Sequence, residues 1–361
     1  MKNLLLYSTT CILLLCACKD NSEFYNPDAI VSERLEVFAD TIYSEKVNDI
    51  SSQIRFLSCI DDFLIVTQRD KDSIFQVVNT ENDSVIAYFG CNGHARNEFT
   101  DPRAVYCRKD KNGSPLLFVL DGIHTKVIDM EKSTKTKKCA VKEIIKENVD
   151  MYFYMTYHIS NNAKFIYKSV SYKDARDAVY MPPLYYMMTN NTKFEWRLYP
   201  QIITPEWTNM VDAAYSNEIW IKPDGSKAIS VANFIDIVNI FDFSKKKTLG
   251  IVNPNSYTYG FIEQNGSENT IKEHLRYFNT SACVTDNSFI ILKDGNLYKD
   301  IIGEEDEERC SSIHIYDWNG RYIKSYLTDK NLLHIAYSEK EKCLYATSIA
   351  HKLYRYNLKL K

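Results

Sequence analysis

The chain has 361 residues, of which 45% are hydrophobic, so it is long enough to bury a large core. Its formal net charge is -3 and it has no long basic tract, which argues against nucleic-acid binding, because that needs a positive surface. Tyr (26) and Phe (17) are abundant and Gly (11) is scarce, a composition that favours half-buried strands joined by turns containing Asn and Asp.

The amino terminus carries the pattern of an export signal. A positive start precedes an apolar run, Leu4 to Leu15, that is too short to span a bilayer. The run ends in Leu15-Cys16-Ala17-Cys18, which resembles the lipobox of bacterial lipoproteins and implies lipidation of Cys18. We predict a signal peptide at 1–17, a lipidated tether at 18–31, and an outer-membrane lipoprotein whose leaflet stays open. The alternative is a plain secretory peptide with a chance cysteine.

Seven cysteines follow the predicted lipidation site: Cys59, Cys91, Cys107, Cys139, Cys283, Cys310 and Cys343. Their odd number and irregular spacing do not form a disulfide framework. Four of them (Cys59, Cys107, Cys283 and Cys343) lie in apolar runs, where cysteine behaves as a small buried hydrophobe. The mature chain has no Cys-x-x-Cys pair, so a thiolate zinc site is not expected.

From residue 54 onward the chain repeats a short antiparallel meander, in which apolar runs alternate with polar turns and the third run ends on Asn or Asp. The units span Ile54–Phe89, Arg103–Asp129, Tyr157–Asn190, Glu218–Asp242, Ala282–Leu327 and Leu333–Asn357. Such a small sheet cannot bury its own faces, so copies must stack beside it. We therefore predict an all-β fold, a six-bladed β-propeller, over residues 32–361.

The last unit ends too close to the carboxyl terminus to hold a fourth strand, and the open edge of its sheet must be covered. The strand-like run Leu35–Tyr43 lies before the first unit and is otherwise unassigned. We predict that it completes the last blade and closes the ring. Val141–Val149 is the one stretch predicted to form one or two helical turns.

The loop between the first two units carries the most specific motif. Within Phe89 to Pro102, the residues Phe89, Gly90, Gly93, Glu98, Phe99 and Pro102 match the loop of NHL-type repeats, whereas Ala95 and Arg96 depart from it. The segment resembles most closely the TolB-like six-bladed propeller lipoproteins of Gram-negative bacteria. The glycines permit positive φ, Phe99 can plug the space between sheets, and Pro102 can start a strand.

Two stretches, Tyr172–Met210 and Val252–Asn279, are longer than the repeat requires, and long insertions on a rigid scaffold often carry function. Within the first stretch, Tyr185, Trp196 and Trp207 can stack on sugar rings, because aromatic faces are flat and apolar. Their apolar neighbours favour a buried position between blades instead.

Inner strands line the channel of a propeller, and the innermost runs begin near Arg55, Arg103, His158, Tyr215, Asn279 and His334. We predict that these six residues line the channel and meet an anionic or hydroxyl-rich ligand. The alternative is that they hydrogen-bond one another and water in a filled channel. Glu218 is the one acidic residue nearby, whereas calcium needs six or more oxygen ligands, so no metal or other cofactor is predicted.

The sequence has no Gly-x-Ser-x-Gly elbow, His-Glu-x-x-His pair or phosphate loop, and no catalytic residue is predicted. We expect a membrane-anchored binding propeller that presents its channel mouth or face loops to a glycan, peptide or protein partner. The alternative is a channel-site hydrolase or lyase of the lactonase or glycosidase kind, which would place two carboxylates or a metal at the channel mouth.

Overall fold

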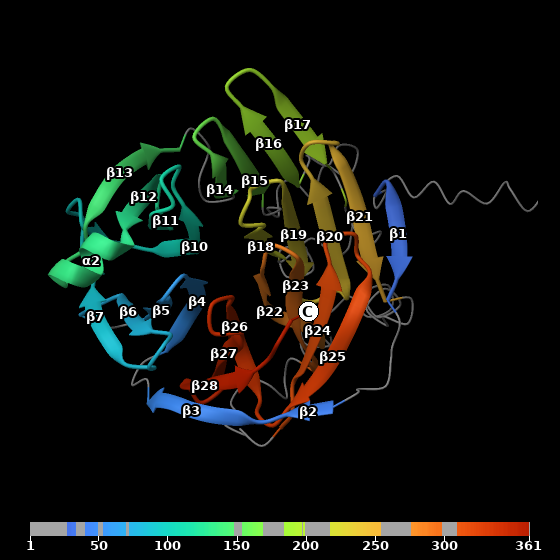
Figure 1. Cartoon of the computed structure of the whole chain (residues 1–361). Helices are drawn as coiled ribbons and strands as arrows, with labels where there is room; N and C mark the ends of the chain where they lie inside the picture. Colours follow the sequence, from blue (N-terminus) through green and yellow to red (C-terminus); the bar gives the residue numbers. More distant parts are fainter. Residues whose placement is uncertain are drawn as a thin grey trace, which may run out of the picture.

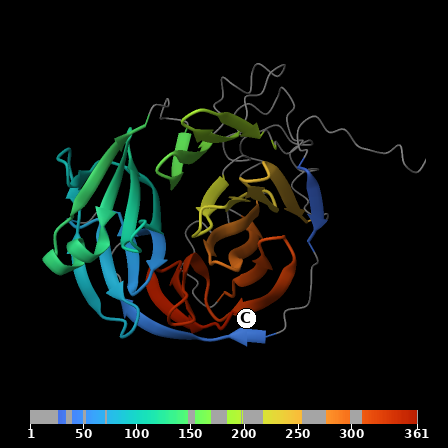
Figure 2. The ribbon, with the colours of Figure 1, turned by 45° about the horizontal axis from the view of Figure 1, so that its top comes forward.

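The computed structural model describes residues 27–33, 40–49, 53–69, 72–147, 154–168, 184–196, 198, 217–253, 276–297 and 309–360. Six sheets stand in a ring, with one strand of each sheet nearest the centre (Figure 1). The view turned by 45° shows the same circular order, from the first blade in blue to the last in red (Figure 2). The predicted all-β fold, a six-bladed β-propeller, is therefore confirmed.

Each blade is an antiparallel meander whose strands follow one another from the channel to the rim. Blade one holds β4 (Ile54–Ile60), β5 (Phe63–Gln68), β6 (Phe75–Asn79) and β7 (Val85–Phe89). Blade two holds β10 (Pro102–Lys109), β11 (Pro115–Asp121), β12 (His124–Asp129) and β13 (Val141–Lys146). Blade three holds β14 (Tyr154–Ser160), β15 (Ala163–Lys168), β16 (Tyr185–Thr189) and β17 (Lys193–Trp196). Blade four holds β18 (Asn217–Ile221), β19 (Lys227–Ala232), β20 (Ile237–Asp242) and β21 (Lys247–Val252). Blade five holds β22 (Arg276–Val284), β23 (Ser288–Leu297), β24 (Ser312–Asp317) and β25 (Tyr322–Thr328). Blade six holds β26 (Leu332–Ser338), β27 (Cys343–Ser348) and β28 (Lys352–Asn357).

The middle strands are apolar on both faces because a neighbouring blade covers each side of every sheet. All seven residues of β11 are buried, and so are five of the six residues of β5. Buried side chains fill the spaces between blades, and one such cluster joins Phe75 and Val77 of blade one to Leu117 and Val119 of blade two. The blades therefore supply one another with the apolar cover that none has alone.

An amino-terminal strand completes the last blade, as predicted, but it lies just after the predicted segment. The closing strand is β3 (Ser44–Asp49), which pairs antiparallel with β28. Part of the predicted run, β2 (Asp40–Ile42), instead pairs parallel with β25 at the rim of blade five. The boundary was misplaced because β2 and β3 are separated by a single residue, Tyr43, and the chain changes sheets there.

A further strand precedes these two. β1 (Ala29–Ser32), within the predicted tether, pairs parallel with β21 and extends blade four. Asp28 accepts a hydrogen bond from the backbone N–H of Thr248 at 2.7 Å, which fixes the chain beside the start of β21. The signal peptide and the first part of the tether, residues 1–26, lie outside the described residues.

The prediction of a helix at Val141–Val149 was wrong. Residues 141–146 form β13, the outer strand of blade two, whose exposed side chains face away from the core. The helix lies earlier, as α2 (Met130–Thr136), where Asp129 caps it by accepting a hydrogen bond from the N–H of Lys132.

The loop between blades one and two has the conformation that its motif requires. Phe99 is fully buried and meets the ring of Phe75 edge-on, with ring centroids 5.2 Å apart. Gly90 has a φ of +74°, and a Cβ there would lie 3.0 Å from the Phe75 ring. Glu98 accepts a hydrogen bond from the N–H of Ala95 at 2.9 Å. The loop thus locks two neighbouring blades together.

A buried ionic cluster fastens the amino-terminal segment to blades four and five. Both carboxylate oxygens of Glu33 lie 2.6 Å from Lys293 Nζ, and Asp236 lies 2.7 Å from the same nitrogen. The hydroxyl of Tyr316 donates a third hydrogen bond to Glu33. Burial disfavours the ionised carboxylate, but His314 and Lys293 outweigh it and hold the pKa of Glu33 well below its usual range.

The ring has two distinct faces. All six inner strands pair with a second strand through short turns at one face, which we call the hairpin face, so they begin at the opposite face. Four long stretches separate consecutive strands of the ring. Two of them separate the outer strand of one blade from the inner strand of the next (199–216 and 254–275), and two separate the second and third strands of one blade (169–183 and 298–308). The described strands that flank these four stretches have their adjoining ends at the face where the inner strands begin, which we call the insertion face. Asp28 lies beside the β20–β21 turn, at the hairpin face.

Candidate functional site

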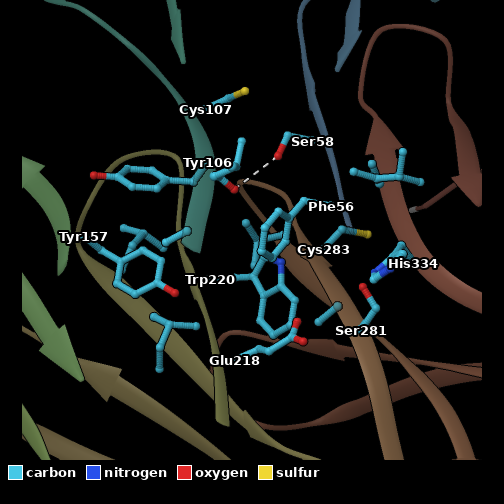
Figure 3. A pocket seen from close by; sticks show the side chains of 18 of the residues that line it. Phe56, Ser58, Tyr106, Cys107, Tyr157, Glu218, Trp220, Ser281, Cys283 and His334 are labelled. Atoms are coloured by element: carbon cyan, nitrogen blue, oxygen red, sulfur yellow. Dashed lines mark hydrogen bonds between the residues drawn. The ribbon is translucent and has the colours of Figure 1, made fainter. Parts of the chain in front are cut away.

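The inner strands enclose a cavity of about 360 Å³ along the axis of the ring. All six contribute to its wall, so the cavity is the central channel of the propeller (Figure 3). Pockets of a few hundred Å³ are large enough to hold a small molecule. Its lining mixes apolar and polar groups, and Phe56, Tyr106, Tyr157 and Trp220 contribute aromatic rings.

One carboxyl group enters this lining, that of Glu218 on β18. Within the described residues it makes no hydrogen bond and no ion pair. Its accessible surface faces the channel, but protein surrounds it, and burial alone raises its pKa from 4.5 to about 7. Near neutral pH the group is therefore divided between its acid and its carboxylate forms.

Two aromatic side chains, Trp220 and Tyr157, line the same part of the cavity as this carboxyl (Figure 3). Trp220 projects from the same face of β18 as Glu218, because alternate residues of a strand share a face (Figure 3). Tyr157 lines the cavity from β14; burial raises the pKa of its hydroxyl, and the charge of Glu218 adds to this effect. This part of the wall therefore combines one carboxyl group with aromatic rings.

Two of the six predicted channel residues line this cavity, Arg103 and His334. The guanidinium of Arg103 donates to the carbonyl of Gly122 at 3.2 Å and lies 4.0 Å from Asp101. Burial and the neighbouring His351 lower the pKa of His334 to about 4, so its ring is neutral at pH 7. Arg55 lies beside the channel, where it pairs with Asp101 at 3.1 Å and is over a third exposed.

The structure places two other predicted residues between blades rather than in the cavity lining. His158 lies 2.7 Å from Glu147, whose carboxylate also binds Lys164 at 2.9 Å. Burial opposes ionisation of Glu147, but the bonds from His158 and Thr125 outweigh it and lower its pKa to about 2. Asn279 is fully buried and donates to the carbonyl of Ala232 at 2.7 Å, which joins blades four and five.

The remaining predicted positions divide in two groups. Tyr215, Trp207 and Cys18 lie outside the described residues. Tyr185 and Trp196 are not loop residues: they lie on β16 and β17, are 1% and 6% exposed, and pack around Phe165 and Phe241. Their rings are covered on both sides by blades three and four, so they present no open face to a sugar.

The thiol groups are not paired in the part of the chain that the structure describes. Cys283 and Cys343 are buried, as predicted, whereas Cys59 and Cys107 are partly buried and line the channel. Burial raises the pKa of Cys59 to about 12, so this thiol stays protonated at neutral pH. No group of three or more potential metal ligands occurs within the described ranges.

A closed ring of six blades with a lined axial channel defines the class of six-bladed propeller proteins. The chain belongs to the TolB-like six-bladed propeller family, whose sequence pattern matches residues 56–340. The comparison with curated proteins gave no match. No helix of the described residues is long and apolar enough to cross a membrane.

Solved structures from Bacteroides show the same fold. One is a member of the DUF4221 family from Bacteroides vulgatus, with a TM-score of 0.54 and 9% identity over 89% of this chain and 97% of that one. Another is a putative exported protein from Bacteroides fragilis, with a TM-score of 0.51 and 8% identity over 91% and 98% of the two chains. At this identity the likeness concerns the fold alone.

Proposed function

We propose that this protein is a binding propeller of the cell envelope, anchored through Cys18, whose central channel receives a ligand from the insertion face. The observation that carries the proposal is the isolated carboxyl of Glu218 in an aromatic cavity. Keeping a carboxyl there without a partner costs folding free energy, and such groups occur most often at functional sites.

The position of Glu218 along the channel agrees with this role. It is the second residue of β18, so it lies toward the insertion face, where the inner strands begin. The described strands on either side of the four long connections have their adjoining ends at the same face, and long connections on rigid scaffolds often carry binding residues. A ligand that enters from this face reaches Glu218 before it reaches the hairpin face.

The anchor would hold the opposite side of the ring. Asp28 binds the chain at the hairpin face, only ten residues after Cys18. Even when extended, a tether of this length spans at most about 36 Å, so the proposed anchor would keep this part of the rim near the bilayer. The signal-like amino terminus and the likeness to a putative exported protein support export.

Anchoring is tested by metabolic labelling with a palmitate analogue and by fractionation of the envelope. The wild-type chain should carry the label and sediment with the membranes. Cys18→Ala should lose both properties, whereas Cys310→Ala, which changes an exposed cysteine of blade five, should keep both. An unlabelled wild-type chain in the soluble fraction would refute the anchor.

Binding is tested by a fluorescence screen of small molecules, sugars and peptides against the mature chain in detergent. A ligand in the channel should change the emission of Trp220, which lines the cavity. Trp220→Phe should lose that signal while the ligand still binds by calorimetry. If no compound of any class binds in the channel, the proposal fails.

A channel-site hydrolase or lyase is the second candidate, and the pKa of Glu218 favours it, since about 7 suits a general acid or base. Glycosidases of the usual kind need two carboxyl groups, and Glu218 is the one acidic side chain in the described lining. Turnover of chromogenic lactones or glycosides that Glu218→Gln abolishes, with binding retained, would establish the enzyme instead.

A further inference from the structure

Within the described part of the chain, Glu218 lacks the positive partner that every buried acidic residue has. The described residues contain four buried acidic residues, and each has a carboxylate oxygen within 3.0 Å of a lysine nitrogen: Glu33 and Asp236 at Lys293, Asp121 at Lys126, and Glu147 at Lys164. The fold thus supplies a cation wherever it buries a carboxylate for structural reasons. At Glu218 no such cation is found among the described residues, although this carboxyl is half-buried rather than buried.

We propose that the channel binds its ligand through a protonated amine, held between the carboxylate of Glu218 and the aromatic wall. This inference rests on the proposed binding function and names its chemical class. An ammonium group forms charge-assisted hydrogen bonds with a carboxylate, and these are about twice as strong as neutral ones.

The aromatic wall suits the same group. The ring faces of Trp and Tyr carry partial negative charge and attract cations, most strongly where water is excluded. Phe56, Tyr157 and Trp220 line the cavity that holds the carboxyl. The chain already uses this contact elsewhere, with Lys126 Nζ 4.7 Å from the centre of the Phe99 ring. An amine with an apolar body therefore meets both a counter-charge and rings.

No basic side chain that lines the cavity supplies this cation. Arg103 is held at Gly122 and Asp101, and it does not contribute to the pKa of Glu218. His334 is neutral above about pH 4. An anionic ligand, which the basic residues at the strand starts suggested, would instead be repelled by Glu218.

The pH dependence follows from the groups that face the cavity. Besides Glu218, the titratable groups in its lining are Cys59 on β4, Arg103, Tyr106 and Cys107 on β10, Tyr157 on β14, Cys283 on β22, and His334 and Tyr337 on β26. Burial raises the pKa of each of these tyrosines and cysteines, and it lowers that of His334 to about 4. Between pH 6 and 8, Glu218 is therefore the group of this lining that changes charge.

The test uses three probes of matched size, phenethylamine, 2-phenylethanol and phenylacetate, with the full mature chain in detergent. Calorimetry should show that the amine binds at least about tenfold more tightly than the other two at pH 8. Its affinity should fall about tenfold from pH 8 to pH 6, because Glu218 takes up a proton with a pKa of about 7.

Glu218→Gln keeps the shape of the side chain and removes its charge. It should bring the amine's affinity down to that of the alcohol and abolish the pH dependence. Glu143→Gln removes the same charge from exposed strand β13, and it should change neither the affinity for the amine nor its pH dependence. Thermal melts of both variants establish that they are folded.

The outcomes separate the two proposals. Amine binding that depends on Glu218 supports both. Binding of the alcohol or the carboxylate in the channel, with no preference for the amine, overturns the inference and leaves the binding function standing. If no probe binds, and the broader screen also finds no channel ligand, both fall.

Discussion

Replacement of Glu218 by glutamine should stabilise the protein at alkaline pH. Burial raises the pKa of this carboxyl from 4.5 to about 7. Between these values the folded chain holds a proton that the unfolded chain has lost, so stability falls as pH rises through this range. Above pH 7 the folded chain must ionise the group in its shielded position. Each pKa unit corresponds to about 1.4 kcal/mol, so the cost approaches roughly 3 kcal/mol.

Glutamine does not titrate, so this part of the pH dependence should vanish in Glu218→Gln. Urea unfolding of the wild type and of Glu218→Gln at pH 5 and pH 8 measures the free energy of unfolding from which this pH dependence is obtained. The stability gained by the variant should be roughly 2–3 kcal/mol larger at pH 8 than at pH 5, by linkage. Comparison at matched pH cancels the titration of all other groups. An equal difference at both pH values would refute the reasoning, because it would mean that Glu218 titrates alike in both states.

Three further changes test the rest of the fold. Lys293→Met removes the lysine that pairs with the buried carboxylates of Glu33 and Asp236, and it should lower the free energy of unfolding by about 3–5 kcal/mol in urea melts. Gly225→Ala should cost about 1–2 kcal/mol more than Gly113→Ala, because φ is positive at both but a Cβ at 225 would lie 2.9 Å from a backbone oxygen. A thiol reagent should modify exposed Cys310 quickly and buried Cys343 only after unfolding, as peptide mapping by mass spectrometry would show.

Each of these has its own contradicting result. A Lys293→Met protein as stable as the wild type would show that the ionic cluster contributes nothing to folding. Equal melting temperatures of the two alanine variants would mean that the neighbouring blade yields at Gly225. Rapid labelling of Cys343 in native buffer would show that blade six opens far more readily than its packing implies.

The strand order could be predicted because its signals are local. Alternating or continuous apolar runs and Asn- or Asp-containing turns occur within a few residues of each strand. The helix α2 was not predicted, because only Met130 and Ser133 of its seven residues are buried and the sequence therefore has no apolar periodicity there. Its cap, Asp129, was instead recognised as the end of a strand.

The channel residues were harder to predict, because a shift of one position turns a side chain to the other face of a strand. Tyr157 lines the cavity, whereas its neighbour His158 binds Glu147 between blades. Asn279 lies at an irregularity in the pairing of β22 with β23, which redirects its side chain. Glu218 was noted only as a neighbour of the predicted ring, since nothing local reveals that its carboxyl lacks a partner.

The ionic cluster around Glu33 had no sequence signal at all. Its members come from a segment before the first blade and from blades four and five, so only the folded ring brings them together. The same holds for the change of sheets at Tyr43, which separates two strands that serve different blades.

The pairing of β3 with β28 also governs the order in which this chain can finish folding. One strand of the last blade is synthesised before all other blades, and its three companions are synthesised after them. A nascent or prematurely terminated chain consequently has an open ring, in which two strand edges of the blades beside the gap are unpaired. The ring closes only when the whole polypeptide has been synthesised, not when any single blade has formed. Truncated mRNAs should therefore yield products that are sensitive to proteolysis.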